Sequence, residues 1–323
     1  MLPIRMTRYF STNLLLLLFS RRPNSSQRLQ RILSREPLLI SSSISINSMK
    51  RLFLFAAYEE AGVVGESLIW YVRNLSKAGD VVLVADSDIG PNELNALAPY
   101  CLYAQAERHE EYDFGSYKRA YAWAAANLDM VSYDYIYLVN DSVYGPLFDL
   151  NPYFQKMEAM SVPAFALVLN PHKRHPHMQS WFVGLDRNVF MQPWFADFLA
   201  SVKKEANKND ICVIYETGLT QLIEAHGLPY KGLYEVSGKK IYNAVRTLYD
   251  AGLPFVKKSA FTRHNGSLGC QLKYVIDRLD AETKSAVLND ARRVYGAEYV
   301  DGLLTSSRLT VTFRYLSYLL KKL

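Results

Sequence analysis

The sequence is poor in the features that mark membrane-embedded, disulfide-bonded or metal-clustering proteins. Its apolar runs, such as residues 14–19, fall far short of the roughly 20 residues that cross a bilayer. Cys101, Cys212 and Cys270 are widely spaced and form no metal-type pair. Reduced, partly buried thiols in a cytosolic protein are therefore expected.

Positive charge is also scarce once the first segment is set apart. The chain of 323 residues has a net charge of +6, but residues 1–51 hold nine bases and one acid. The rest of the chain is left with a net charge of −2 and shows no nucleic-acid-binding motif. We therefore expect no nucleic-acid partner.

Residues 1–48 are rich in arginine and serine and poor in acids. Three interpretations stay open for this segment: an over-extended gene start, a transit-like leader or a secretory signal. All three place it outside the fold, as a disordered segment. The first strand is expected directly after Met49.

From Met49 onward, apolar runs alternate with helical patterns. Half of the residues are hydrophobic and 21% are charged, as in globular proteins. Continuous apolar runs predict buried strands at residues 52–57, 81–85, 100–104, 133–139, 164–169 and 180–185. Helical spacing predicts helices at residues 65–77, 91–97, 116–128, 189–206 and 217–226, and a mostly helical chain from residue 230. This alternation is typical of an α/β fold with a mainly parallel sheet.

Three polar residues, Asn140, Asp141 and Ser142, end the fourth of these strands. Open α/β sheets bind ligands at the carboxyl edge, to which such a strand end delivers its side chains. Asp141 offers a carboxylate for a divalent cation that neutralises a diphosphate, and its neighbours offer neutral oxygens. The alternative is a plain strand-to-loop turn, which the same residue types favour.

A second polar cluster precedes the helix predicted at 116–128. Asp113 and Ser116 are suitable N-terminal caps, and Gly115 permits a close backbone approach. Ligand phosphates can lie against such a helix start, with Lys118 and Arg119 one turn further on. A capped helix with a solvated basic face is the alternative.

Glu216 precedes the helix predicted at 217–226. It is either a simple cap, favoured by the helix dipole, or a base that removes the proton of an attacking sugar hydroxyl. Three histidines within residues 172–177 lack the helical spacing of metal-binding pairs. We expect instead a mobile basic loop, in which His177, Gln179 and Ser180 contact the acceptor or the diphosphate.

These stretches together resemble the rhamnan synthesis protein F family, which comprises bacterial polysaccharide and lipopolysaccharide glycosyltransferases. The resemblance covers about residues 52–232, and its most specific element is Asn-Asp-Ser-x-x-Gly-Pro-Leu. The stretches that carry it are Tyr112-Asp113-Phe114-Gly115-Ser116, Asn140-Asp141-Ser142-Val143-Tyr144-Gly145-Pro146-Leu147, Gln179-Ser180-Trp181-Phe182 and Glu216-Thr217-Gly218-Leu219-Thr220.

The resemblance implies a GT-A-like fold that binds a dTDP- or UDP-linked sugar and a glycan or lipid-linked glycan acceptor. It places Asp141 at the diphosphate–metal position and Glu216 where inverting enzymes carry the base. The residues that it places at the donor are Asp86, Ser87, Asp113, Gly115, Asn140, Asp141 and Ser142.

Two departures from the family pattern bear on the donor site. Arg108-His109-Glu110-Glu111 stands where family members usually show Asn-x-Gly, and the triplet has one carboxylate instead of an Asp-x-Asp pair. A divalent cation, Mg²⁺ or Mn²⁺, is therefore expected to be weakly held or replaced by cationic side chains. The candidates for that replacement are Lys118, Arg119, Lys173 and Arg174.

The expected organisation is a leader at 1–48, a GT-A-like catalytic domain at 49–236 and a helical extension packed on it at 237–323. The expected function is transfer of a sugar, with rhamnose as a candidate, to a surface polysaccharide or lipopolysaccharide, with inversion. A non-catalytic glycan-binding or scaffold component is the alternative. The tail at 313–323 is expected to pack on the domain or to lie on the inner face of the cytoplasmic membrane.

Overall fold

The computed structural model describes residues 49–262 and 268–305, together with residues 309, 312, 313 and 316. All of them belong to the unit Asn47–Leu323. The expected leader lies outside the described residues, and so does most of the tail at 313–323.

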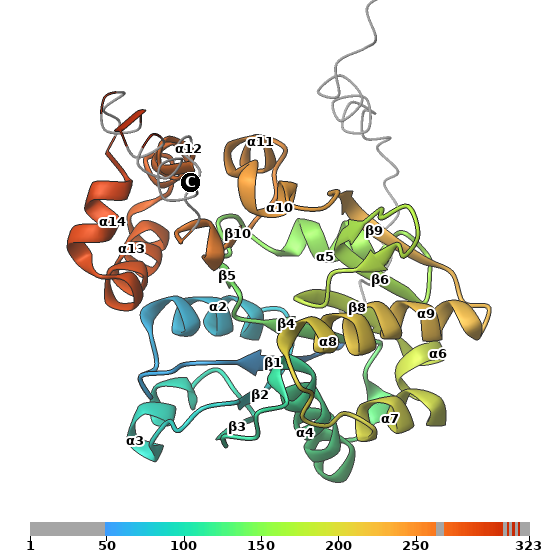
Figure 1. The fold of residues 1–323 in the computed structure, drawn as a ribbon. Helices are drawn as coiled ribbons and strands as arrows, with labels where there is room; N and C mark the ends of the chain where they lie inside the picture. Colours follow the sequence, from blue (N-terminus) through green and yellow to red (C-terminus); the bar gives the residue numbers. More distant parts are fainter. Residues whose placement is uncertain (1–48, 263–267, 306–308, 310–311, 314–315, 317–323) are drawn as a thin grey trace, which may run out of the picture. The chain divides into compact units, whose positions relative to one another are not determined.

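The sheet is built on parallel apolar strands, as the sequence predicts (Figure 1). Its parallel part runs in the order β3 (Tyr103–Ala106), β2 (Asp80–Ala85), β1 (Arg51–Ala57) and β4 (Tyr135–Asn140). Beyond β4 follow the antiparallel β8 (Phe182–Asp186), then β6 (Ala164–Asn170), with β7 (His177–Met178) and β9 (Tyr230–Glu235) paired to β6. The prediction of a mixed, mainly parallel sheet flanked by helices is confirmed.

Alternation of side chains along β1 explains why helices cover both faces of the sheet. Phe53 and Phe55 point to one face and pack with residues of α2 (Glu66–Ser76) and α5 (Asn151–Glu158). Leu52 and Leu54 point to the other face, which is covered by α4 (Tyr112–Asn127), α7 (Pro193–Ala200) and α9 (Gly218–Ala225). Because neither face meets water, the strand is apolar almost throughout.

The helices of the C-terminal part form an apolar cluster of their own on a short antiparallel ribbon. The ribbon consists of β5 (Val143–Tyr144) and β10 (Val256–Lys257). The helices of this cluster are α11 (Val245–Asp250), α12 (Leu268–Ile276), α13 (Ala281–Tyr295) and α14 (Ala297–Leu303), whereas α10 (Lys240–Asn243) packs its Ile241 into the cluster that contains Phe53 and Phe55. Buried Asp290 of α13 accepts a 2.7 Å hydrogen bond from Ser67 Oγ and so joins α13 to α2.

Several elements differ from the predicted ones. The chain after residue 230 was expected to be helical, but β9 pairs in parallel with β6, and Gly232 allows the two backbones to come close at Leu169. The helix predicted at 189–206 is divided, because Asp186 caps α6 (Arg187–Phe190) and Pro193 begins α7. The short helical segments not yet named are α3 (Pro91–Leu94), η1 (Asn95–Leu97), η2 (Met130–Ser132), α8 (Lys208–Ile211), η3 (Cys212–Thr217) and η4 (Lys258–Ala260).

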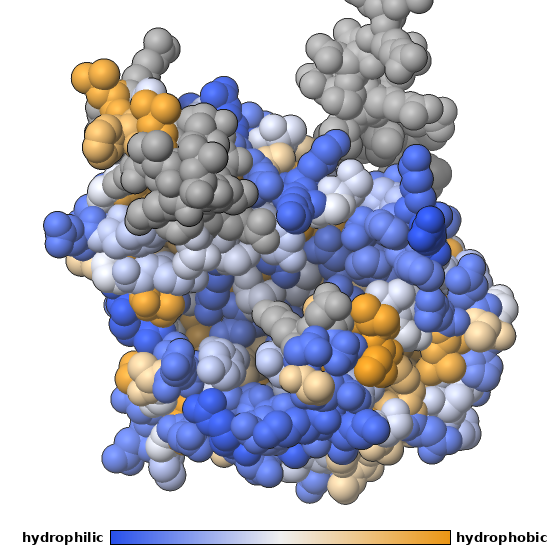
Figure 2. Space-filling model, viewed as in Figure 1, coloured by the Kyte–Doolittle hydropathy of each residue, from blue (hydrophilic) through white to orange (hydrophobic). Residues whose placement is uncertain are grey.

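The surface in Figure 2 is mainly hydrophilic, and its apolar residues form separate small groups. No helix among the described residues combines the length and the apolar character needed to cross a bilayer.

Candidate active site

The carboxyl ends of β1, β2 and β4 meet at one edge of the sheet, and the predicted polar residues follow there. Asn140 ends β4 and lies in register with Ala56 of β1, while Asp86 directly follows β2. Asp141 and Ser142 come next along the chain. Ligands of open α/β sheets bind at this edge.

Asn140 joins the end of β4 to the first turn of α4. Its Nδ2 donates a 2.8 Å hydrogen bond to Asp113 Oδ2. Its Oδ1 accepts from the Ser142 backbone N at 3.1 Å and from Ser142 Oγ at 2.6 Å. The triplet therefore forms the turn that its composition favours and also connects two of the predicted site segments.

Asp86 holds the turn that leads into α4. Its carboxylate accepts backbone hydrogen bonds from His109 and Glu110, each at 2.9 Å, and from Tyr112 at 3.3 Å. Glu110 and Tyr112 have φ angles of 59° and 56°, a region that non-glycine residues seldom adopt. The buried carboxylate thus stabilises a strained turn and positions α4.

Ser87 and Gly115 serve the same region of the fold. Ser87 Oγ is buried and accepts a 2.6 Å hydrogen bond from the Glu59 backbone N. A Cβ atom at Gly115 would collide with Glu111 Cβ and lie 2.8 Å from the His109 ring. The close approach that Gly115 permits is therefore that of the chain's own turn.

The prediction that Asp113 and Ser116 cap the helix is wrong, because α4 begins at Tyr112 and both residues lie inside it. Ser116 Oγ instead lies 3.0 Å from His109 Nε2. Burial lowers the pKa of His109 below its ordinary value, although the Asp86 carboxylate opposes this effect. The imidazole is therefore held neutral between α4 and its preceding turn.

Glu216 precedes α9, as predicted, and lies in the π-helical turn η3, which runs directly into that helix. Its Oε2 accepts hydrogen bonds from the Ser180 backbone N at 2.9 Å and from Ser180 Oγ at 2.7 Å. Its Oε1 lies 3.7 Å from His177 Nε2. The side chain is 22% exposed, so the carboxylate is fixed by two donors and still reaches solvent.

Tyr117 of α4 connects the two halves of the site. Its hydroxyl donates a 2.9 Å hydrogen bond to the Ser180 carbonyl, and the Asn140 backbone N donates a 3.2 Å hydrogen bond to the carbonyl of the next residue, Trp181. Burial raises the pKa of Tyr117 well above its ordinary value, so it remains a neutral donor. Asp113, Asn140, Ser180 and Glu216 thus belong to one hydrogen-bonded network, which we call the edge network.

Gln179 is buried beside this network. Its Oε1 accepts a 2.8 Å hydrogen bond from Trp181 Nε1. The structure therefore brings the three predicted contact residues, His177, Gln179 and Ser180, together with Glu216.

Asp141 lies on the α2 side of the same strand end, where its charge acts on Tyr71. Its Oδ2 accepts a 3.3 Å hydrogen bond from Lys258 Nζ. Burial raises the pKa of Asp141 above its ordinary value, and Lys258 opposes this. Burial likewise acts to lower the pKa of Lys258, but the attraction of Asp141 and Asp290 outweighs it and raises that pKa.

Lys257 and Lys258 were missed by reasoning from the sequence. Lys257 Nζ donates a 2.9 Å hydrogen bond to Ser142 Oγ and lies 4.7 Å from the centroid of the Trp181 ring. The two lysines come more than a hundred residues after the triplet, in a part expected to be helical. The available signal was the apolar run at residues 253–256 that ends in two adjacent cations.

Comparison with protein families adds to this geometry. A family model described as Rhamnan synthesis protein F matches residues 81–314. The chain belongs to this family. The match extends past residue 232, where the resemblance of the motifs stops, and includes β10 and the helices α10–α14.

Solved structures show weaker likenesses to this family member. The mannosyltransferase Ktr4p from S. cerevisiae is 9% identical, with a TM-score of 0.35, over 55% of this chain and 68% of that chain. A putative nucleotide-diphospho-sugar transferase from Desulfovibrio desulfuricans G20 is 12% identical, with a TM-score of 0.39, over 79% and 99% of the two chains. Core-mannan synthase A from Aspergillus fumigatus, in a Mn/GDP form, is 13% identical, with a TM-score of 0.30, over 49% and 65%. With TM-scores below 0.5, these likenesses support no inference about activity. No curated protein matches the chain.

The residues at the end of β4 are a poor fit for a divalent cation in this family member. Asp141 is the carboxylate of the triplet, and the Lys258 ammonium already lies beside it. The Oδ1 atom of Asn140 is taken by Ser142. Among the residues that the structure describes, no three His, Cys, Asp or Glu side chains are grouped so as to hold a metal ion.

The cations proposed from the sequence to replace the metal lie elsewhere. Lys118 and Arg119 are within ion-pair distance of Glu111, at 3.7 Å and 2.6 Å. Lys173 and Arg174 are exposed in the loop before β7. The cations next to the triplet are Lys257 and Lys258 instead.

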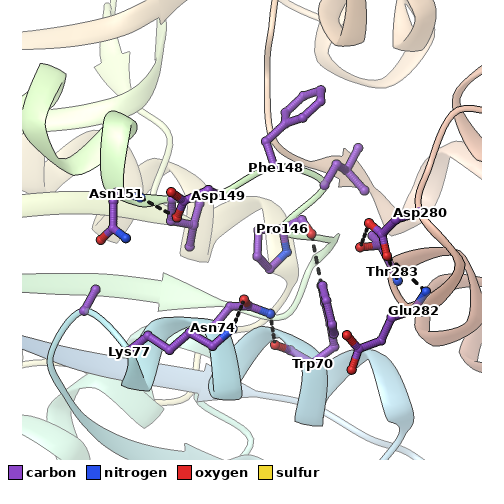
Figure 3. A pocket seen from close by; sticks show the side chains of 13 residues that line it. Trp70, Asn74, Lys77, Pro146, Phe148, Asp149, Asn151, Asp280, Glu282 and Thr283 are labelled. Atoms are coloured by element: carbon purple, nitrogen blue, oxygen red, sulfur yellow. Dashed lines mark hydrogen bonds between the residues drawn. The ribbon is translucent and has the colours of Figure 1, made fainter.

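A pocket of about 410 Å³ lies apart from the edge network (Figure 3). Trp70 and Asn74 of α2 line it from one side and Asp280 and Thr283 from another, and none of the predicted site residues lines it. Trp70 Nε1 donates a 3.0 Å hydrogen bond to the Pro146 carbonyl across its rim. The part of α2 that lines the pocket leads away from the carboxyl edge of the sheet. The pocket is therefore separate from the edge network.

Proposed function

We propose that this protein is a glycosyltransferase that moves a sugar from a dTDP- or UDP-linked donor to a hydroxyl of a surface polysaccharide or lipopolysaccharide. Membership of the rhamnan synthesis protein F family supports this class of reaction and makes rhamnose the first candidate sugar. The observation that carries the proposal is the edge network, which unites Asp113, Asn140 and Glu216 at the ligand-binding edge of the sheet.

In the proposed arrangement the nucleotide lies against the start of α4, and the diphosphate lies at residues 140–142. Asp86, Ser87 and Gly115 act by positioning, because their contacts define the turn before α4. Asp113 reaches the donor side from the first turn of α4. The proposed domain is GT-A-like, and the helical part from residue 237 packs on it through pairs such as Ser67 and Asp290.

The proposed chemistry is a direct displacement with inversion. The Glu216 carboxylate takes the proton of the acceptor hydroxyl, and the freed oxygen attacks the anomeric carbon as its bond to the diphosphate breaks. The nucleoside diphosphate leaves with the bonding electron pair. His177, Gln179 and Ser180 hold the acceptor beside Glu216, which fits the 2.7 Å bond from Ser180 Oγ to that carboxylate.

Release of nucleoside diphosphate from a panel of dTDP-, UDP- and GDP-sugars, with and without a glycan acceptor, tests this proposal. Glu216→Gln keeps an oxygen that accepts from Ser180, so we expect a folded protein with at least a hundredfold lower turnover. Glu224→Gln, at an exposed position of α9, is the matched control and should match the wild type. Activity of Glu216→Gln within a few-fold of wild type would eliminate Glu216 as the base.

The same panel separates the enzyme from a glycan-binding or scaffold component. A nucleotide sugar that binds the folded state must raise its apparent stability. If no nucleotide sugar does so while glycans do, the scaffold alternative holds. The proposed setting is the cytoplasm, with peripheral contact to the membrane at a lipid-linked acceptor, and cosedimentation with liposomes of anionic lipid tests that contact.

A further inference from the structure

The β5–β10 ribbon brings a pair of lysines back to the polar triplet. In its antiparallel register Lys257 faces Val143, and the backbone N of Lys258 donates a 3.0 Å hydrogen bond to the Ser142 carbonyl. Gly145, at a φ of 142°, leaves room for the incoming chain, because a Cβ there would lie 2.6 Å from the Phe255 ring. The Asn-Asp-Ser-x-x-Gly-Pro-Leu element thus receives the segment that carries both lysines.

Both ammonium groups are held at the triplet by named contacts. Lys257 Nζ bonds to Ser142 Oγ at 2.9 Å and lies over the Trp181 ring, a favourable position for a cation. Lys258 Nζ bonds to Asp141 Oδ2 at 3.3 Å. The side chains of Lys258 and Asp141 are 21% and 13% exposed, so this largely buried pair still borders solvent.

Lys257 and Lys258 place two positive charges at the triplet before a ligand binds. Two ammonium groups stand against the single carboxylate of Asp141. Further off, Arg293 is paired with both Glu59 and Asp290. These two carboxylates exceed Arg293 by one negative charge, which offsets the remaining positive charge of the lysine pair. Because a buried ion pair adds little net stability, stability alone is a weak reason for placing Lys258 here.

We propose that Lys257 and Lys258 hold the donor diphosphate and offset its charge, in the role that a divalent cation fills in metal-dependent transferases. This inference rests on the proposed function. Each ammonium carries three donors and acts as a point charge on phosphate oxygens. As the sugar–phosphate bond breaks, the growing negative charge on the leaving diphosphate is met by these fixed charges. Asp141 acts as a positioning residue, which orients Lys258.

Calorimetric titration with UDP, dTDP and GDP in the presence of EDTA tests the lysine pair without any turnover. The wild type should bind at least one of them, and added Mg²⁺ or Mn²⁺ should change its Kd by no more than a few-fold. Lys257→Gln should raise the Kd about ten- to a hundredfold, the loss expected for one hydrogen bond to a charged group. Lys257→Arg should stay within a few-fold of the wild type.

Two further variants test the role of Lys258 and control for the loss of a lysine elsewhere on the protein. Asp141→Asn/Lys258→Met removes both members of the buried pair, so no unpaired charge remains, and it should also bind at least tenfold more weakly. Lys156→Gln is the matched control, because exposed Lys156 lies in α5, whose Glu158 pairs with Arg51 at the amino end of β1. If the double variant does not fold, which circular dichroism would show, Lys257→Gln and Lys257→Arg decide the matter.

The outcomes separate this inference from the proposed function. Binding that requires Mg²⁺ or Mn²⁺, or binding in EDTA that Lys257→Gln leaves unchanged, would overturn the role of the lysines and leave the transferase proposal intact. No binding of any of the three nucleotides, with metal or without it, would overturn both.

Discussion

The side-chain amide of Asn140 donates a 2.8 Å hydrogen bond to Asp113 Oδ2 and so fixes the end of β4 against the first turn of α4. Asn140 is buried, and its other contacts shape the turn at Ser142. One amide thus carries both the local fold of the strand end and the link to the helix.

Asn140→Ala should lower the free energy of unfolding by about 1–3 kcal/mol, because it leaves buried partners without their hydrogen bonds. Asn127→Ala is the matched control, since exposed Asn127 bonds within its own helix to the Trp123 carbonyl, and its effect should stay within about 0.5 kcal/mol. Urea denaturation of the three proteins measures both. Equal stability of the two variants would show that the Asn140 contacts contribute nothing.

The fold should become less stable as the pH falls just below 6.5. Burial lowers the folded-state pKa of His109 below its ordinary value of 6.5, so in that range the unfolded chain binds a proton that the folded chain does not. His109→Gln should reduce the slope of unfolding free energy against pH between about 5.5 and 7, relative to the wild type. An unchanged slope in His109→Gln would contradict this account.

Gly115→Ala should destabilise the protein by about 1–3 kcal/mol, because the added methyl group collides with the turn before α4. Gly90→Ala is the control, since a Cβ at Gly90 meets no atom within 4 Å. Thermal unfolding monitored by circular dichroism compares the two. A Tm of Gly115→Ala equal to that of Gly90→Ala would mean that the turn shifts at no cost.

Tyr117 should couple the two halves of the edge network. Tyr117→Phe removes the 2.9 Å bond to the Ser180 carbonyl, and we expect turnover about tenfold lower because Glu216 loses part of its support through Ser180. A double-mutant cycle with Asn140→Ala should be non-additive, since both residues belong to one network. Strictly additive effects on turnover would show that the halves act independently.

The strands of the parallel sheet could be predicted because their signal is local. β1, β2 and β4 are buried on both faces, and their apolar runs mark them within a residue or two. β9 could not be predicted in this way, because most of its residues are only half-buried and its pairing with β6 alone makes it a strand. Tertiary pairing outweighs local propensity there.

In the candidate site, too, only the features with a local sequence signal could be predicted. The proximity of Asp113 and Asn140 follows from the shared edge of parallel strands, and the sequence indicates it. The hydrogen bonds of Asp86 to the turn at residues 109–112 do not follow from any local pattern, since they join segments more than twenty residues apart. Lys257 and Lys258 reach the triplet through a ribbon that pairs two distant dipeptides, which no periodicity reveals.

The central claim is that the carboxyl-edge corners form the donor site, and mapping a bound nucleoside diphosphate tests it most directly. Hydrogen–deuterium exchange with saturating UDP, dTDP or GDP should show protection at residues 109–116, 140–145 and 256–258. Protection confined to residues 70–78 and 146–151, which line the separate pocket of Figure 3, would contradict the account.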